Sequence, residues 1–439
     1  MPKSKLLVGI ALAGLVWGAL AMPARAAAIE TGTVVHAGNL DDLLGQTFDG
    51  TPLSELIPEQ FQWQIRAKGL TMKLAQPKPH LLDPVWLKAS EKNRGTVSLD
   101  PKTRAVKGWE AGVPFPDVKT NDPDAGLKII WNLFYGKPNG DSQIFPNGTA
   151  IMINGESGIE GITRQQFTRI LLKGLLRRKD APTLGSGKIF EKDLLVMTAP
   201  EVFKGSGFLY YRYDTGETDY LLIYAKDANK VVKWSGEFWM DEVGETDFLG
   251  DDLMIFSAYP TWYDAYKVLG KKKILVVAET ANPYWNPKEK ERNKRYPGFN
   301  IENWPHWNPV DEWMPREVYV LEAKAPVLHP YSRKVIYIDA KTWVPYLGEF
   351  YTKQDELWKT TIQGYRTFPI EKEPKGTILW PVWAMIADFR KNHATILATD
   401  GSVRFNEEID PSWVNLDTLK GGRKGVEVDV PWSELSPEE

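Results

Sequence analysis

The 439-residue sequence contains no cysteine and only five histidines. Without cysteine the chain can form no disulfide, offers no thiolate metal ligand and carries no cysteine for lipid attachment after cleavage. The histidines never occur as HxH or HExxH, so a zinc site would need scattered residues to converge. We therefore expect neither a metal nor a cofactor. The five are His36, His80, His306, His329 and His393.

Catalytic motifs are also missing. No GxSxG sequence supports a nucleophilic serine. Asp241-Glu242 and Asp251-Asp252 are candidate acid pairs for a glycosidase, but they crowd into one glycine-containing loop, whereas such enzymes place one carboxylate on each side of the scissile bond. The same loop lacks the alternating oxygen ligands of an EF-hand. The sequence therefore predicts a protein that is not an enzyme.

Long apolar runs are confined to the N-terminus. Lys3 and Lys5 precede the run Leu6–Met22, and Ala24-Arg25-Ala26 has the small-x-small form of a signal-peptide cleavage site. Since glycines interrupt the run and Pro23 follows it, a retained membrane anchor is the less favoured alternative. We expect cleavage of residues 1–26 and a soluble mature protein in the periplasm.

Charge and aromatic content narrow the class of partner. Removing residues 1–26 leaves 51 basic and 57 acidic residues, a net charge of −6, which argues against a nucleic-acid partner. The chain holds 18 Trp, 17 Tyr and 17 Phe. This surplus suits either a heavily packed β core or a surface that binds apolar or sugar rings.

The N-terminal half predicts few regular elements. Residues 27–60 predict an arm with one short helix at Leu40–Leu44, and the alternation that follows predicts a strand within Phe61–Leu74. The clearest helical pattern covers Arg164–Arg178, where apolar side chains recur at a 3.6-residue period before Pro182. We expect this segment to be an amphipathic helix that lies on an apolar surface.

From Gly207 onward the pattern is typical of β structure, with a hairpin, an antiparallel meander and a short helix at Trp262–Leu269. The expected strands are Phe208–Tyr213, Tyr220–Lys226, Val231–Trp239, Ile274–Ala278, Arg316–Ala323, Arg333–Asp339, Trp343–Tyr351, Leu357–Tyr365 and Trp383–Thr399.

Several of these strands are apolar on both faces, since Val335 and Tyr337 alternate with Ile336 and Ile338. Both faces of the sheet must then be covered, and helices are too few for a βαβ arrangement. We predict a mainly β fold, a large curved antiparallel sheet that forms an unclosed half-barrel with amphipathic helices as a lid. Residues 61–439 should form one large domain.

A lidded half-barrel is a plausible container for an apolar ligand, because its walls would desolvate such a molecule. The alternative is that the same side chains pack against each other as an ordinary core. The candidate ligand-binding residues are Phe167, Ile170, Leu171, Leu175, Tyr211, Tyr213, Trp234, Phe238, Val335 and Tyr337.

The order of several segments resembles domain-of-unknown-function family 1329, within the LolA/LolB-like group of periplasmic lipoprotein carriers. The likeness extends over about residues 55 to 430 and depends on order and spacing rather than on one motif. The segments are Gly112–Pro116, Gly126–Asn132, Ala199–Pro200, Lys204–Gly205, Leu209–Asp214, Phe248–Asp252, Arg316–Ala323 and His329–Asp339.

The resemblance implies an unclosed, strongly curved antiparallel barrel with helices over an apolar cavity, and no catalysis. It implies a carrier or receptor for a lipid or other hydrophobic small molecule in the Gram-negative envelope. It also makes an inner-membrane transporter of the resistance-nodulation-division type, together with an outer-membrane partner, plausible as partners.

Our leading hypothesis is thus a periplasmic carrier of a hydrophobic ligand. The first alternative is a carbohydrate-binding or glycoside-hydrolysing protein that stacks sugars on Trp285, Trp304, Trp307 and Trp313. The second is a structural scaffold of an envelope transport complex with a collapsed cavity.

Overall fold

The computed structural model describes residues 27–179, 182–234, 236–280, 298–399 and 402–421. The predicted signal peptide, residues 1–26, lies outside them. Among the residues that are described, no helix is long and apolar enough to cross a membrane.

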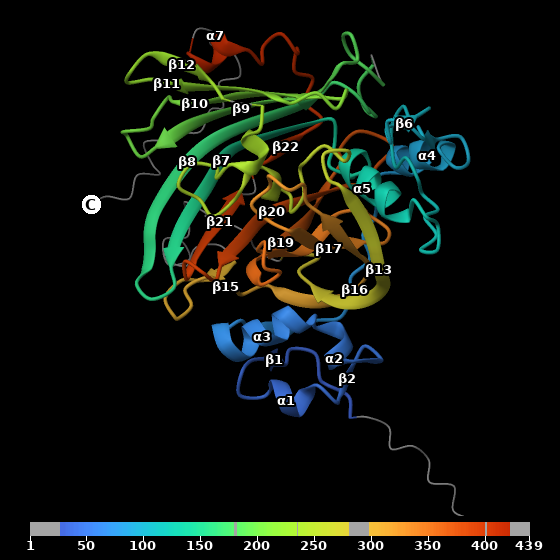
Figure 1. Ribbon diagram of the computed structural model, residues 1–439, viewed down its shortest axis with the longest axis vertical. Coiled ribbons are helices and arrows are strands. Elements are labelled where there is room, and N and C mark those ends of the chain that lie inside the picture. The colour runs from blue at the N-terminus through green and yellow to red at the C-terminus, as the bar shows by residue number, and fades with distance from the viewer. Residues whose placement is uncertain (1–26, 180–181, 235, 281–297, 400–401, 422–439) are drawn as a thin grey trace, which may run out of the picture.

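One sheet of 16 strands dominates the structure (Figure 1). Its order is β1-β4-β16-β17-β18-β19-β20-β21-β7-β8-β9-β10-β11-β12, while β13 pairs with β16 and β22 pairs with β7. The strands are β1 (Val34–Val35), β4 (Met72–Leu74), β7 (Ser142–Asn154), β8 (Gly158–Leu171), β9 (Ile189–Ala199), β10 (Gly207–Tyr213), β11 (Tyr220–Ala225), β12 (Lys230–Lys233), β13 (Ala265–Val276), β16 (Glu312–Lys324), β17 (Arg333–Asp339), β18 (Pro345–Tyr351), β19 (Leu357–Pro369), β20 (Thr377–Asp388), β21 (His393–Thr399) and β22 (Arg404–Phe405).

The sheet is unclosed and mixed. β12 pairs only with β11, and β13 pairs only with β16, in the part of the chain that the structure describes. β4 lies parallel to the start of β16, where Glu312 pairs with Lys73, and β13 runs antiparallel to β16 from Met314 onward. This edge is the exception to the predicted antiparallel sheet, because β4, which follows the N-terminal arm, pairs in parallel with the part of β16 that β13 leaves free.

Register shifts bend the sheet into a half-barrel. β7 and β8 change register between Phe145 and Gly148, and β19 and β20 do so between Gly364 and Tyr365. Each bulge adds a residue on one strand and increases its local twist. Figure 1 shows the long strands β7 and β8 curving around the interior of the molecule.

The N-terminal arm covers the outer face of this curve (Figure 1). Its side chains Leu56, Phe61 and Ile65 are buried in one cluster with Tyr337 of β17 and Leu347 of β18. The elements of the arm are α1 (Leu40–Leu43), β2 (Thr47–Phe48), β3 (Thr51–Pro52), α2 (Leu53–Leu56) and α3 (Glu59–Lys68).

The inner face is covered by α5 (Ala125–Tyr135) and by residues 236–264, which we call the inner loop. Figure 1 shows the inner loop within the curve of the sheet. Phe248 and Phe256 of this loop are buried with Ile336 and Ile338 of β17. The smaller elements on this side are η1 (Phe238–Met240), η2 (Gly250–Asp252), α4 (Pro84–Lys92), β5 (Ser98–Leu99) and β6 (Val106–Lys107).

A C-terminal segment covers the outer face of β8 to β11. Leu419 of α7 (Leu416–Leu419) and Val414 are buried with Ile170, Leu209 and Leu222. A separate two-stranded ribbon is formed by β14 (Phe299–Asn300) and β15 (Asn308–Pro309). The predicted two-sided burial of the strands is therefore confirmed, with different segments on the two faces.

The largest error of the sequence analysis is the helix at Arg164–Arg178, because these residues form most of β8 and the turn after it. Both faces of β8 carry apolar groups, so period 2 and period 3.6 fit its sequence about equally well. The lid helix is α5 instead.

Three smaller predictions were also wrong. Most of Phe61–Leu74 is helix α3, Trp262–Leu269 leads into strand β13, and Trp383–Thr399 is a hairpin of β20 and β21 rather than one strand. The helix at Leu40, the β10–β11 hairpin and the β16–β19 meander are confirmed.

The packing of the arm predicts the effect of a cavity at Phe61, whose side chain is fully buried against the sheet. Phe61→Ala should lower the free energy of unfolding by about 3–5 kcal/mol, measured by urea denaturation. Glu55→Ala, at an exposed position of α2, should change it by less than about 0.5 kcal/mol. Equal losses in the two variants would contradict the proposed packing.

Candidate functional site

The inner loop is held on the sheet by one buried lysine. Lys334 of β17 is completely buried, and its ammonium lies 2.9 Å from Asp251 Oδ1 and 2.8 Å from Asp252 Oδ1. It also donates to the carbonyl oxygens of Asp251 and Ile255, at 3.0 and 3.3 Å. Every one of these acceptors belongs to the inner loop, so a single side chain of the sheet binds it at three residues.

Aromatic neighbours complete the coordination of the two carboxylates. Tyr263 donates to Asp251 at 2.6 Å, Tyr331 donates to Asp252 at 2.7 Å, and His329 Nε2 lies 3.3 Å from Asp251. Burial raises the pKa of Asp251, but the charges of Lys334 and His329 outweigh it and hold that pKa well below its usual value. The Asp251 carboxylate therefore stays ionised inside the protein.

Strain in the inner loop is located beside this cluster. Met254 and Ile255 have φ values of 54° and 67°, in the left-handed region that disfavours a β-branched residue such as Ile255. The side chain of Ile255 also lies against Gly348 of β18, where an added Cβ would come within 2.7 Å of it. The bonds from Lys334 hold this backbone in a conformation that it would not adopt alone.

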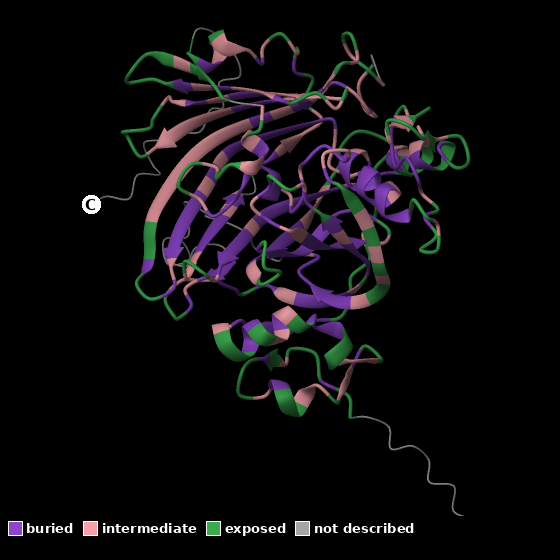
Figure 2. Cartoon of the chain, in the orientation of Figure 1, coloured by how far each residue is buried: buried purple, intermediate pink, exposed green. Residues whose placement is uncertain are grey.

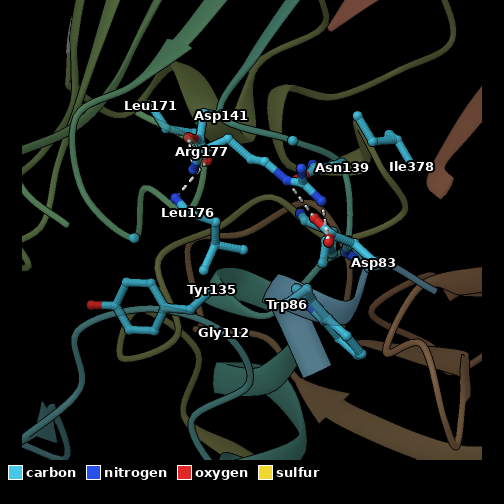
Figure 3. Close-up of a pocket in the computed structure, with 14 residues that line it drawn as sticks. Asp83, Trp86, Gly112, Tyr135, Asn139, Asp141, Leu171, Leu176, Arg177 and Ile378 are labelled. Carbon is cyan, nitrogen blue, oxygen red and sulfur yellow. Dashed lines mark hydrogen bonds and ion pairs between the residues drawn. The ribbon is translucent and has the colours of Figure 1, made fainter. Parts of the chain in front are cut away.

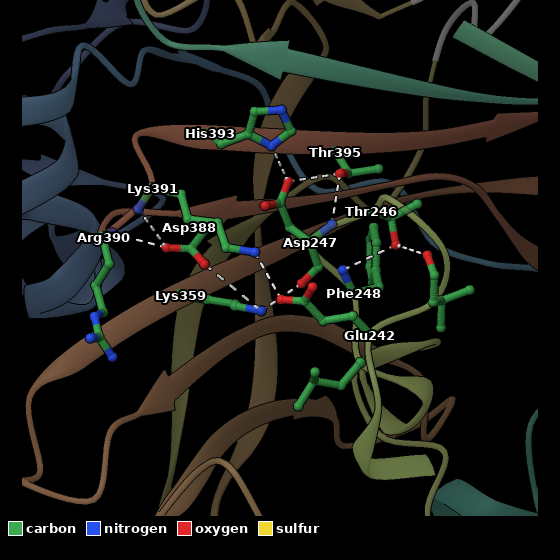
Figure 4. A network of polar contacts seen from close by, with 12 residues as sticks. Glu242, Thr246, Asp247, Phe248, Lys359, Asp388, Arg390, Lys391, His393 and Thr395 are labelled. Atoms are coloured by element: carbon green, nitrogen blue, oxygen red, sulfur yellow. Dashed lines mark hydrogen bonds and ion pairs between the residues drawn. The ribbon is translucent and has the colours of Figure 1, made fainter. Parts of the chain in front are cut away.

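A second polar network fixes the middle of the inner loop to β21 (Figure 4). Asp247 of the loop lies 2.6 Å from His393 Nδ1 and accepts from Thr395 at 2.7 Å. His393 Nε2 lies 3.4 Å from Glu160 of β8. The hydrogen bond with Asp247 raises the pKa of His393, and the Asp247 and Glu160 charges add to it against the opposing effect of burial. Lys359 donates to the Asp247 carbonyl at 2.6 Å.

A third cluster, of charged side chains, connects the strands β8 to β10 to the inner loop and to α5. Arg169 pairs with Asp193 through two contacts of 2.9 and 2.6 Å. Arg212 lies 3.5 Å from Asp219, donates to the carbonyl of Ser257 in the inner loop, and places its guanidinium 5.3 Å from the Phe134 ring of α5. This cluster closes one end of the inner face.

Beyond that cluster the inner face of β8 to β12 is apolar and open. Cross-strand pairing aligns one residue from each of these five strands, and paired residues point to the same side of a sheet. Tyr210 lies two positions after Phe208 in β10 and so points to the same side of the sheet. Its ring centroid is 5.4 Å from that of Phe238 in the inner loop, so the five residues face inward. We call this set the open apolar row: Phe167, Leu195, Phe208, Ile223 and Val232.

The open apolar row is uncovered in the described structure. Val232 is 40% exposed, and the other four side chains are partly exposed. Leu195, Phe208, Ile223 and Val232 belong to none of the three hydrophobic clusters of the described residues. Figure 2 shows the contrast, since β16 to β21 are mostly buried and β8 to β10 are mostly intermediate.

The ten residues proposed from the sequence do not line one cavity. Only three lie on the inner face near the open apolar row, namely Phe167, Trp234 and Phe238, with the indole of Trp234 donating to Asp241. Three belong to the outer-face packing: Val335 and Tyr337 under the arm, and Ile170 under α7.

The other four are dispersed. Leu171 lines a separate small hollow, Leu175 is buried after β8, and Tyr213 is partly exposed at the end of β10. The Tyr211 hydroxyl donates to the Val414 carbonyl on the outer face. The predicted helix had placed Ile170 and Leu171 on one side, whereas adjacent residues of a strand point to opposite sides.

Sequence reasoning missed Lys334 and four members of the open apolar row, Leu195, Phe208, Ile223 and Val232. A signal for Lys334 was present, because it lies in a strand that is apolar on both faces, and a lysine buried in such a strand is paired with an acid. Asp251-Asp252 was a candidate pair of acids. The apolar row had no such signal, since its residues come together only through the register of five strands.

The tryptophans and acids of the carbohydrate alternative have other roles. Trp307 and Trp313 are buried, while the Trp304 ring packs over Gly69; Trp285 lies outside the described residues. Glu242 pairs with Lys391, and Asp251-Asp252 bind Lys334. These residues therefore provide neither a shared stacking surface nor a free acid pair in the part of the chain that is described.

Removing the lysine should be costly. Lys334→Met leaves two buried carboxylates without their cation, and we expect the free energy of unfolding to fall by about 3–5 kcal/mol. Urea denaturation followed by near-ultraviolet circular dichroism measures this. Adding Asp251→Asn and Asp252→Asn to Lys334→Met should restore part of the loss. As a control, Lys341→Met at an exposed position should be neutral; a neutral Lys334→Met would refute the assignment.

The pH dependence of stability should reveal His393. Because its pKa is raised in the folded state, its contribution is full below its ordinary pKa of about 6.5 and is lost as the pH rises through the folded value. The stability difference between the wild type and His393→Gln should therefore be larger at pH 5.5 than at pH 9. A pH-independent difference in thermal unfolding would contradict this.

Similar solved structures include a Vibrio parahaemolyticus domain provisionally named for outer membrane lipoprotein sorting (16% identity, TM-score 0.46, 68% of this chain and 99% of that one). A DUF1329 family protein from Desulfovibrio piger (15%, 0.44, 64% and 92%) and a LolA superfamily protein from Nitrosomonas europaea (12%, 0.39, 67% and 98%) are also similar.

None of the curated proteins compared with the chain matches it. The model of one family, described as proteins of unknown function, matches residues 34–415, most of the chain. The chain belongs to this family, DUF1329.

Proposed function

We propose that this protein binds a hydrophobic ligand, such as a lipid acyl chain, on the inner face of β8 to β12. The observation that carries the proposal is the open apolar row, a band across five strands that neither α5 nor the inner loop covers. A soluble protein leaves such a band exposed at the cost of hydrating it, and an apolar ligand would remove that cost.

The sizes of the groups suit an acyl chain. Phe167 and Phe208 offer flat rings, Leu195 lies between them in the cross-strand order, and Ile223 lies on the other side of Phe208. Each methylene group transferred from water to this surface contributes about 0.8 kcal/mol. The open apolar row contains only apolar side chains and so offers no group that could catalyse a reaction, which supports a carrier rather than an enzyme.

We place this activity in the periplasm. The support is the predicted export signal of residues 1–26, which the structure does not describe. In this proposal the protein passes its ligand between membrane-bound partners, one of them an inner-membrane transporter of the resistance-nodulation-division type. A lipid found after organic extraction of the gently purified protein would support the carrier role.

A charge in the open apolar row should abolish binding. Phe208→Asp should raise the dissociation constant of a fluorescent fatty acid about tenfold or more, because an acyl chain would then have to desolvate a carboxylate. Fluorescence titration measures this. Thermal stability should change little, since Phe208 is partly exposed and packs into none of the described clusters.

The matched control is Val202→Asp, in the exposed turn between β9 and β10. It adds the same charge away from the row and should bind the fatty acid like the wild type. Wild-type protein that binds no fatty acid and carries no extractable lipid would refute the proposed function. Equal loss of affinity in both variants would show that the fatty acid does not bind at the open apolar row.

A further inference from the structure

A small hollow lies on the other side of the charged cluster of β8 to β10. The space between its walls that is free of protein atoms amounts to about 440 Å³, with the open solvent at its mouth included. Figure 3 shows its walls, with Trp86 and Tyr135 on one side and Leu171 and Ile378 on others. These walls come from α4, α5, β8 and β20, so the hollow is built by segments far apart in the sequence.

The acids and the arginine in the walls already have partners among the described residues, whereas one lysine has none there. Arg177 pairs with Asp83 through contacts of 2.5 and 3.1 Å. Asp141 accepts from the backbone amides of Leu176 and Arg177 at 2.9 and 2.7 Å. Asp83 and Arg177 therefore pair with each other, and backbone amides satisfy the oxygens of Asp141 without a ligand.

Lys137 is the exception. It lines the hollow just after α5, but within the described chain its ammonium makes no hydrogen bond and no ion pair within 4 Å. The other cations in such surroundings all have an acid, as Arg177, Arg169 and Lys334 show. An ammonium that lies against apolar walls without an ion-pair partner can accept an anion as its counter-charge.

The backbone holds Lys137 firmly in this position. Its carbonyl accepts from the amide of Asn139 at 2.9 Å, and the carbonyl of Pro138 accepts from the amide of Leu379 at 3.0 Å. The segment is thus tied to β20.

The charges around Lys137 are consistent with an ammonium that lacks an anionic partner. Burial lowers the pKa of Lys137 to about 7; Glu191 opposes this, while Arg169 and Arg212 add to it. The other titratable groups at the hollow are Asp83, Asp141, Arg177 and Tyr135. An anion at the ammonium would replace the lost hydration and favour the charged form.

We propose that this hollow is a binding site for a small organic carboxylate, with Lys137 as the group that pairs with its charge. One ammonium matches one negative charge, which favours a monoanion over phosphate. The aromatic and aliphatic walls fit a compact apolar body such as a phenyl ring or a short alkyl chain. This site is separate from the open apolar row and does not depend on the function proposed for it.

Isothermal titration of the full chain with benzoate tests the proposal. At pH 6.5 benzoate should bind, and benzyl alcohol and inorganic phosphate should bind at least about tenfold more weakly. Above pH 7 the affinity for benzoate should fall, towards about tenfold per pH unit, because binding requires the charged lysine.

The decisive variant is Lys137→Met, which keeps the length of the side chain and removes the charge. It should weaken benzoate binding at least about tenfold, while Lys88→Met, an exposed position of α4, should leave it unchanged. If Lys137→Met fails to fold, the pH series of the wild type still decides. Wild-type benzoate affinity in Lys137→Met, phosphate binding as tight as benzoate, or pH-independent affinity would overturn the proposal.

Discussion

The pairing of Lys334 with Asp251 and Asp252 is the interaction on which the interior of this protein depends. A β-sheet curved into an unclosed barrel leaves a concave face that must be covered, and here an irregular loop covers much of it. An irregular loop forms few hydrogen bonds within its own backbone, so side chains of the sheet must hold it in place. Lys334 meets three residues of the loop at once and holds the strained Ile255 among them. Replacing it by an apolar residue would keep the packing but lose the fixed position of the loop.

This anchoring divides the sheet into two parts. From β16 to β21 both faces are buried, and the strands serve as a rigid wall. From β8 to β12 the outer face is packed under α7, while the inner face keeps exposed apolar side chains beyond the Arg169 and Arg212 cluster. Surface available to a ligand therefore lies beside the covered half rather than beneath its cover, and binding on it requires no movement of the inner loop.

Elements whose sequence pattern lies within one segment could be predicted, whereas residues that meet only through the pairing of strands could not. The hairpin after Gly207 and the meander from Arg316 have strong alternation and turn residues, and both form as expected. The segment at Arg164 has apolar groups on both faces, which no single period describes, and it is a strand. The candidate ligand-binding residues do not come together for a related reason: Ile170 and Phe167 fit one helical face but lie on opposite sides of β8. Residues such as Leu195 and Phe208 meet through register, which is a property of the pairing and not of either strand.

The free edge at β13 has a consequence for the behaviour of the protein in concentrated solution. An unpaired edge strand offers backbone donors and acceptors to any other chain, and two sheets that join in this way begin an aggregate. β13 carries exposed lysines at positions 267, 271 and 272. A second copy approaching edge to edge would bring these like charges together and leave some of them without water. The lysines of this edge thus oppose the growth of an open half-barrel into a longer sheet.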